Sequence, residues 1–211
     1  TKRPKAGQSS SSACALNTIT VTFTTNVPLV QNCNTKLTVH GLSGTQTPAG
    51  LLAIQQENFW TDLAGARHHN STLFKPNGTW DGSGSLVLEL GENITSSRPG
   101  DAIVFSFQLK NQNDENLNNG IELETTGISI DLTPLVDEFT DEPGTPGMTY
   151  RWGHPVNIRA PEFTVKSITS NNPWPGGTNT ITMTIKSNVD LKGSEEAEIT
   201  ISGLAGASWE A

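Results

Sequence analysis

Threonine and apolar residues alternate near the start of the chain. Residues 18–24 place an apolar side chain at every second position, and these positions are Ile19, Val21 and Phe23. Successive side chains of a strand point to opposite faces, so a period of two predicts a half-buried strand. The alternation returns over residues 36–40 after a link rich in turn residues, which predicts a second strand.

This strand–link–strand pattern occurs twice. Residues 17–44 align without a gap on residues 179–206, at an offset of 162 positions, and 12 of the 28 positions are identical. Where the copies differ, apolar character is kept at the core positions, as in Val21/Met183 and Phe23/Ile185. A conserved spacing of this length is typical of repeated modules, and it predicts the same opening structure in both copies.

Further short strands are predicted between the two copies, at residues 51–54, 85–90, 102–109, 121–124, 128–132, 156–158 and 163–168. The strongest pattern is 102–109, where the alternating apolar residues are Ile103, Phe105, Phe107 and Leu109. About seven short strands per module favour an all-β fold, and within it an Ig-like antiparallel β-sandwich. Residues 137–147, with four acidic residues and two turn signals, predict an exposed loop.

The repeat divides the chain into three expected parts. Residues 1–16 are expected to form a flexible polar arm, residues 17–162 an Ig-like sandwich module, and residues 163–211 the first strands of a second, incomplete module. An open sandwich edge exposes unpaired backbone groups and needs a partner. The residues expected to meet that partner are Phe163, Val165, Ile168, Ile181, Met183, Ile185, Ile199 and Ile201.

Two interpretations of these ends stay open. In the first, residues 163–211 complete or cap a neighbouring subunit by strand addition or head-to-tail packing. In the second, the sequence is an excerpt of a longer chain whose next residues complete the second module. The start at Thr1 without a methionine also suggests a processed or excerpted product.

Three motifs together resemble a known family: the strand sequence of residues 17–29, the Gly-Leu-Ser-Gly-Thr-Gln-Thr-Pro of residues 41–48, and the Pro-Gly-Gly-Thr-Asn-Thr-Ile-Thr of residues 175–182. They are similar to the tandem Ig-like repeats of very large secreted or cell-surface proteins of algae and other protists. The resemblance covers residues 17–211. It implies a wall, hair, stalk or extracellular-filament protein and carries over no catalytic residue.

Cys14 and Cys33 depart from that pattern, because the second copy has Gly176 and Glu195 at these positions. An antiparallel hairpin of the first two strands would place the cysteines roughly 20 Å apart, beyond the reach of a disulfide. A folded-back link would allow an intrachain bond, a common state for a secreted pair. A disulfide to another chain and two free thiols also agree with the sequence.

Charge and hydropathy exclude two classes of partner. The net charge of −8 provides no phosphate-neutralising surface, so no nucleic acid is expected to bind. No run approaches the roughly 18 apolar residues of a membrane span. The expected location is extracellular or at the cell surface. Asn70, Asn77 and Asn93 begin N-glycosylation sequons, although about four sequons arise by chance at this composition.

No catalytic, metal or cofactor site is predicted. His40, His68, His69 and His154 lack the spacing of metal ligands. Residues 111–119 are favoured as a polar loop over a calcium site, since they lack the ordered EF-hand spacing. Tryptophans can form a sugar-binding platform or bury in the interior, and exposure decides between these roles for Trp60, Trp80, Trp152, Trp174 and Trp209.

The sequence therefore predicts a non-enzymatic structural subunit of an extracellular glycoprotein filament, wall or surface layer. Its expected partners are copies of itself, in a homopolymer, or adjacent repeat modules, and glycans are possible ligands. The alternative is a carbohydrate-binding or adhesive cell-surface module. Self-assembly without an added ligand favours the first function, and a soluble monomer retained by glycans favours the second.

Overall fold

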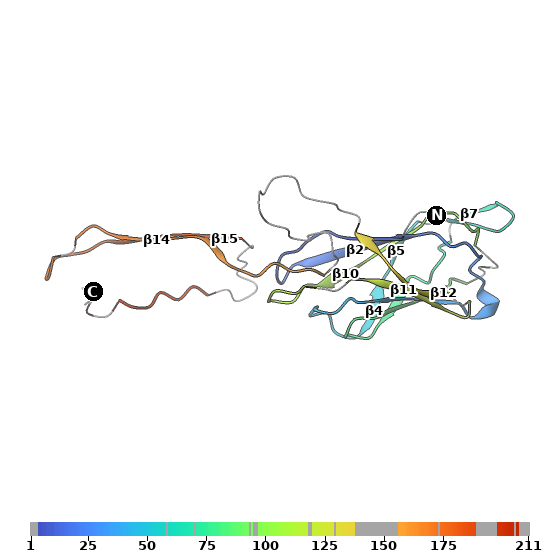
Figure 1. Ribbon diagram of the computed structural model, residues 1–211, viewed down its shortest axis with the longest axis horizontal. Helices are drawn as coiled ribbons and strands as arrows, with labels where there is room; N and C mark the ends of the chain where they lie inside the picture. Colours follow the sequence, from blue (N-terminus) through green and yellow to red (C-terminus); the bar gives the residue numbers. More distant parts are fainter. Residues whose placement is uncertain are drawn as a thin grey trace. The chain divides into compact units, whose positions relative to one another are not determined.

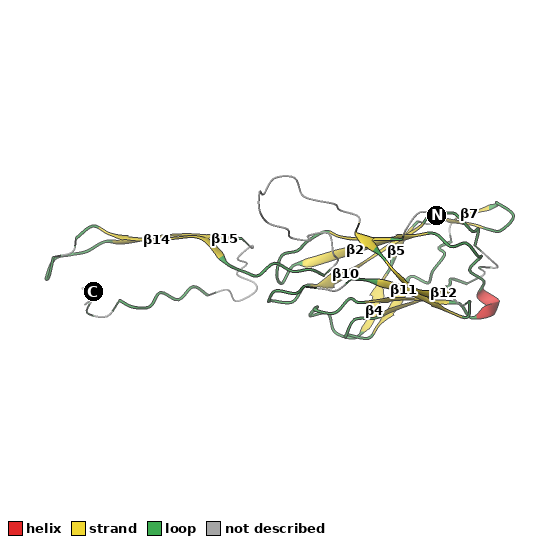
Figure 2. Ribbon diagram, viewed as in Figure 1, coloured by secondary structure: helices red, strands yellow, loops and turns green. Residues whose placement is uncertain are grey.

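The computed structural model describes residues 4–57, 59–69, 71–92, 94, 97–117, 120–128, 130–137, 156–172, 174–188, 198–204 and 206. The chain divides into two compact units, unit 1 from Thr1 to Pro161 and unit 2 from Glu162 to Ala211. Strands dominate both units, and the described residues contain one short 3-10 helix, η1 at Gln31–Cys33 (Figure 2). The predicted all-β fold class is confirmed. Within the described part of the chain, no helix is long and apolar enough to cross a membrane.

The first sheet of unit 1 has five strands in the order β13-β1-β2-β10-β5. Neighbouring strands are antiparallel except for β1 and β13, which are parallel. The strands are β1 Lys5–Gln8, β2 Leu16–Phe23, β5 Gln55–Gln56, β10 Ile103–Lys110 and β13 Val136–Asp137.

The second sheet has six antiparallel strands in the order β12-β11-β3-β9-β8-β4. β6 and β7 form a separate two-stranded antiparallel sheet. The predicted strand pair of the repeat is thus divided between the sheets, with β2 in the first and β3 in the second. The bounds are β3 Lys36–His40, β4 Gly50–Ala53, β6 Phe59–Thr61, β7 Arg67–His69, β8 Asn77–Trp80, β9 Leu86–Glu89, β11 Glu122–Thr126 and β12 Ile130–Pro134.

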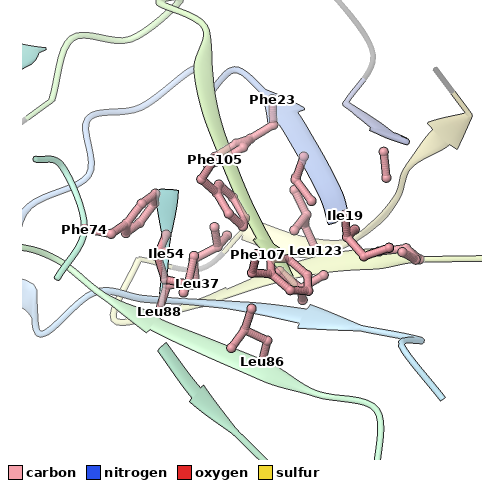
Figure 3. Packing of buried hydrophobic residues seen from close by; sticks show 14 of the residues in the cluster. Ile19, Phe23, Leu37, Ile54, Phe74, Leu86, Leu88, Phe105, Phe107 and Leu123 are labelled. Atoms are coloured by element: carbon pink, nitrogen blue, oxygen red, sulfur yellow. The ribbon is translucent and has the colours of Figure 1, made fainter. Parts of the chain in front are cut away.

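The core of unit 1 lies between the two sheets, where the alternating residues of β2 and β10 face the second sheet. Phe105 lies between Phe23 and Phe74 and meets both rings edge-on, with centroid distances of 6.3 and 5.7 Å (Figure 3). The apolar positions predicted on β2 are buried, and so are Phe105, Phe107 and Leu109 on β10. The period-two pattern therefore identified the inward faces of both strands.

Strand β1 contradicts the flexible arm expected over residues 1–16. Lys5–Gln8 pairs antiparallel with β2, and Ala6 is only 1% exposed because its small side chain packs into the core. The expected strand at 156–158 is also wrong: Ile158 forms a single bridge to Asn116. The loop expected at 137–147 lies outside the described residues except for Asp137, which belongs to β13.

Unit 2 contains an antiparallel hairpin of β14 Phe163–Ser170 and β15 Ile181–Ser187, which lie side by side in Figure 1. Among the described residues these two strands pair only with each other. Residues 198–204, which correspond to β3 and the turn after it at the offset of 162, are described without strand pairing.

Candidate assembly surface

The hairpin of unit 2 repeats the register of β1 and β2. Adding 162 to each pair of β1 and β2 partners gives a pair observed between β14 and β15. Ala6 faces Val21 in unit 1, and Ile168 faces Met183 in unit 2. All four pairs correspond, so the repeat extends upstream of residue 17 to include β1.

The turn between the strands is repeated with its hydrogen bonds. The backbone N–H of Ser10 donates to Asn17 Oδ1 at 3.1 Å, and the N–H of Asn172 donates to Asn179 Oδ1 at 3.1 Å. A left-handed residue follows in both turns, Cys14 with φ 58° and Gly176 with φ 75°. The second copy therefore has a glycine in place of Cys14, at a left-handed backbone position that glycine adopts without steric cost.

Equivalent apolar side chains of the two copies differ in their exposure to solvent. Val21 is 0% exposed in unit 1, whereas its counterpart Met183 is 38% exposed in unit 2. The same inversion holds for Ala6 and Ile168, which are 1% and 60% exposed. Further exposed apolar residues of unit 2, each with a buried counterpart in unit 1, are Ile181, Ile199, Ile201 and Leu204. Unit 2 thus presents to solvent the positions that form the core of unit 1.

We use "apolar hairpin face" for the side of β14–β15 that carries Ile168, Ile181, Met183 and Ile185. The same face also carries Lys166, opposite Ile185, and Ser170, opposite Ile181, whereas Thr182 and Thr184 lie on the opposite face with Thr169 and Ser167. Val165 lies opposite Lys186 in the regular register of the hairpin, three residues before Ile168, and therefore on the polar side, whereas the register shift between Phe163 and Val165 displaces Phe163. Of the assembly residues predicted on the hairpin, Val165 therefore does not share the face, and Phe163 lies beyond the irregularity.

A buried amide network, which the sequence did not indicate, closes the turn of unit 1. Asn17 and Asn111 are both 0% exposed, and Asn17 Nδ2 donates to Asn111 Oδ1 at 3.0 Å and to Gln8 Oε1 at 2.9 Å. Asn111 Nδ2 donates to the carbonyl oxygens of Ser10 and Ser12. Asn111 was expected in a polar loop, but it joins the end of β10 to the β1–β2 turn.

A cavity of about 390 Å³ lies in unit 1 between the ends of both sheets. Thr25, at its wall, is 6% exposed, and its hydroxyl oxygen has no hydrogen-bond partner within the described structure. Apolar and uncharged polar side chains form the wall, which is lined by Pro4, Phe23, Thr24, Thr25, Asn26, Leu37, Leu123, Thr125, Ile130 and Thr133.

The histidines of the described residues take part in local contacts. His68 and His69 lie on β7, a strand where a loop was expected, and His68 stacks on Trp60 with ring centroids 4.2 Å apart. The hydrogen bond from His68 Nε2 lowers the pKa of Asp62. Within the described parts of the chain, no three His, Cys, Asp or Glu side chains group together to hold a metal ion.

The tryptophans divide by exposure. Trp60 and Trp80 are buried at 6% and 1%, whereas Trp174 is 76% exposed. Trp60 Nε1 donates to Ser71 Oγ, and Trp80 Nε1 donates to the carbonyl oxygen of Thr47. Burial removes these two side chains from any sugar-binding platform. Trp152 and Trp209 lie outside the described residues.

Both cysteines are free thiols, with Cys14 half-buried and Cys33 exposed. They flank β2, since Cys14 precedes its first residue and Cys33 lies in η1 beyond its other end. A bond to another chain stays a prediction.

Of the sequon residues, Asn77 is exposed at the start of β8, and its glycosylation is likewise a prediction. Asn70 and Asn93 lie outside the described residues.

Two further carboxylates, Asp81 and Glu89, have depressed pKa values. Burial would raise the pKa of Asp81, but backbone N–H groups of Ser85, Ser83 and Gly84 donate to its Oδ1 at 3.0, 2.7 and 2.9 Å and hold that pKa well below 3.8. Hydrogen bonds from Lys36 and Lys75 lower the pKa of Glu89 to about 2. Glu89 ties β9 to neighbouring segments at the surface.

The Asp81 turn gives a pH-dependent prediction. Asp81→Ala is expected to lower the free energy of unfolding of unit 1 by about 1 kcal/mol at pH 7, because three backbone donors lose their acceptor. The folded pKa is depressed, so this stabilisation is complete above the ordinary pKa and declines as the pH falls below about 4. Urea unfolding at pH 7 and pH 3 checks it. A difference between variant and parent that is equal at both pH values would contradict the assignment.

Comparison with known proteins identified no relative: no protein-family model matches the chain, and no curated protein matches it.

Proposed function

We propose that this protein is a structural subunit of an extracellular filament, wall or surface layer, and that the apolar hairpin face is its assembly surface. The observation that supports this function is the exposure in unit 2 of positions that unit 1 buries. Contiguous exposed apolar residues on a soluble domain mark interaction sites. Fully burying an exposed isoleucine or methionine side chain contributes about 1.5–3 kcal/mol. Ile168, Ile181 and Met183 are 38–60% exposed, so covering each of them contributes a part of that free energy to association.

The likeness between the two units supports assembly in preference to a sugar-binding role. The hairpin carries the residue pattern of a sandwich layer, and such a layer is stable when a second layer covers it. In contrast, Trp174 is the one exposed tryptophan among the described residues, and a flat sugar platform uses several aromatic faces. Copies of the chain or neighbouring modules, joined head to tail, are the proposed partners.

Sedimentation velocity of three purified proteins tests this function. The parent chain is expected to sediment as multimers whose size grows with concentration. Met183→Lys places a charge on the apolar hairpin face and is expected to weaken association at least about tenfold, the equivalent of 1.4 kcal/mol. Thr182→Lys adds the same charge to the opposite face of the same strand, and it should behave as the parent. Equal behaviour of the two variants would contradict the assignment of the face.

A further inference from the structure

We propose that the Trp174 side chain of one copy of this chain inserts into the cavity of unit 1 in the next copy. This inference deepens the proposed function and rests on it for the partner, which is a second copy of the same chain. It adds a contact that is separate from the apolar hairpin face, and it names the residues on both sides of that contact.

Trp174 lies in the turn between β14 and β15 and, at 76%, is the most exposed large apolar side chain of the described residues. Its backbone N–H donates to Asn172 Oδ1 at 3.1 Å, and its carbonyl oxygen accepts from the N–H of Gly177 at 3.3 Å. Asn172 is fixed in turn, because its Nδ2 donates to the carbonyl oxygen of Thr178 and its N–H to Asn179 Oδ1. The turn therefore holds the backbone that presents the indole before a partner arrives, which reduces the entropy lost on binding.

The repeat gives Trp174 no place in a sandwich core. Its counterpart at the offset of 162 is Ser12, a half-buried residue of the β1–β2 turn. The carbonyl oxygen of Ser12 accepts a hydrogen bond from Asn111 Nδ2. A small polar residue thus occupies this turn position in unit 1, where two sheets already enclose the core. A rigidly presented, exposed tryptophan at such a position is typical of an interface anchor.

The cavity of unit 1 suits an uncharged aromatic side chain. Its volume of about 390 Å³ falls within the range of roughly 300–1,000 Å³ of pockets that hold small molecules. Its wall consists of apolar side chains, threonines and one asparagine, and none of the described residues that form it is charged. An indole combines a large apolar ring with a single neutral donor, so it matches such a wall without leaving a charge buried.

Thr25 offers a polar contact inside the cavity. Its side chain is 6% exposed, and its hydroxyl oxygen has no hydrogen-bond partner within the described structure. A buried hydroxyl without a partner destabilises the fold, and a donor from another molecule removes that penalty. Because a threonine rotates about χ1, the hydroxyl can turn to meet a donor that enters the cavity. The Nε1–H of an indole is such a donor.

Trp174 and the cavity each lie at the end of their own unit that is farther from the connection between the units. In unit 2, the turn with Trp174 is at the opposite end of the hairpin from Phe163, where the chain enters β14. In unit 1, the cavity lies at the Phe23 end of β2. The chain leaves unit 1 beside the β1–β2 turn, where the Arg159 N–H donates to the carbonyl oxygen of Ser11 at 2.9 Å. A contact between these two ends is heterologous and joins copies head to tail.

Sedimentation velocity of full-length variants tests the contact. Trp174→Ala is expected to weaken association at least about tenfold, because it removes the inserted side chain. Leu51→Ala is the matched control, since Leu51 is 72% exposed on β4 and does not line the cavity. It should behave as the parent. A Trp174→Ala chain that assembles as the parent does would overturn the inference.

Thr25→Val separates the role of the hydroxyl in binding from its role in the fold. Valine has a similar shape and removes the unpaired oxygen, so the urea midpoint of the variant should equal or exceed that of the parent. Association should nevertheless weaken at least about threefold, because the indole N–H loses its acceptor. In a Trp174→Phe chain, which has no such N–H, Thr25→Val should have no further effect. Equal effects of Thr25→Val in both backgrounds would overturn the pairing of Trp174 with Thr25.

A labelled peptide of residues 169–182 measures the cavity without self-assembly. Fluorescence anisotropy with the intact Trp174→Ala chain is expected to show saturable binding of one peptide per chain. The same peptide with Trp174→Ala should bind at least about tenfold more weakly.

The outcomes separate this inference from the proposed function. Multimers that Met183→Lys abolishes and Trp174→Ala leaves unchanged, together with no saturable peptide binding, would overturn the cavity site and leave the assembly surface standing. Saturable, Trp174-dependent peptide binding in a protein whose parent stays monomeric would support the cavity as an indole site. It would contradict self-assembly, and with it the second copy as the occupant.

Discussion

Replacing Phe105 by alanine is expected to lower the free energy of unfolding of unit 1 by about 3–5 kcal/mol. Phe105 is 1% exposed and contacts the rings of Phe23, Phe74 and Phe107. The substitution removes the transfer free energy of the ring and leaves a cavity that β10, held between β2 and β5, has little freedom to close.

Chemical denaturation of the intact chain, monitored by circular dichroism, measures this loss. Val104→Ala is the matched control, since Val104 is the adjacent residue of β10, points to the opposite face and is 41% exposed. It should cost about 1 kcal/mol or less. Equal losses for the two variants would contradict the placement of Phe105 in the core.

Gly41→Ala is expected to cost about 2–4 kcal/mol, because the substitution combines two separate penalties. Gly41 has φ +82°, a left-handed conformation that an alanine adopts at a cost of about 1 kcal/mol. A Cβ at this position would also overlap the backbone carbonyl of Gly120, and a backbone atom moves only if the neighbouring turn moves.

Gly100→Ala separates the two penalties, since Gly100 has φ +86° in the same unit, and a Cβ there meets no atom of the described residues within 4 Å apart from its chain neighbours. It should show the conformational penalty alone. The difference between the two variants in urea unfolding then gives the cost of the contact with Gly120. Equal losses of unfolding free energy for the two variants would mean that the turn at Gly41 shifts to accommodate the added Cβ without loss of stability.

The strands with a clear period of two were predictable from the sequence, because their pattern follows directly from the burial of one face. β2, β3 and β10 belong to this group. β1 was missed because Lys-Ala-Gly-Gln has no alternation, and its two buried residues, Ala6 and Gly7, are small. The signal was nevertheless present at the offset of 162, where the more apolar Ile168 occupies the position of Ala6.

The candidate assembly surface was predictable in its composition and less so in its geometry. Ile168, Ile181, Met183 and Ile185 follow from the repeat, and alternation along the strand places Val165, three residues before Ile168, on the opposite face. Only the register irregularity beside Phe163 is not marked by any side-chain pattern. Asn111 was assigned to a polar loop, since its burial depends on Asn17, which lies 94 residues away. A local sequence pattern does not show a hydrogen bond between residues so far apart, because the fold is what brings them together.

The most direct test of the structural role is the particle mass of the purified parent chain, measured in the absence of any ligand. Sedimentation over a range of concentrations, with electron microscopy of the same samples, is expected to give multimers that grow with concentration and convert to monomers in Met183→Lys. A parent chain that stays monomeric throughout the range, and is retained on immobilised glycans, would contradict the structural role and favour the adhesive one.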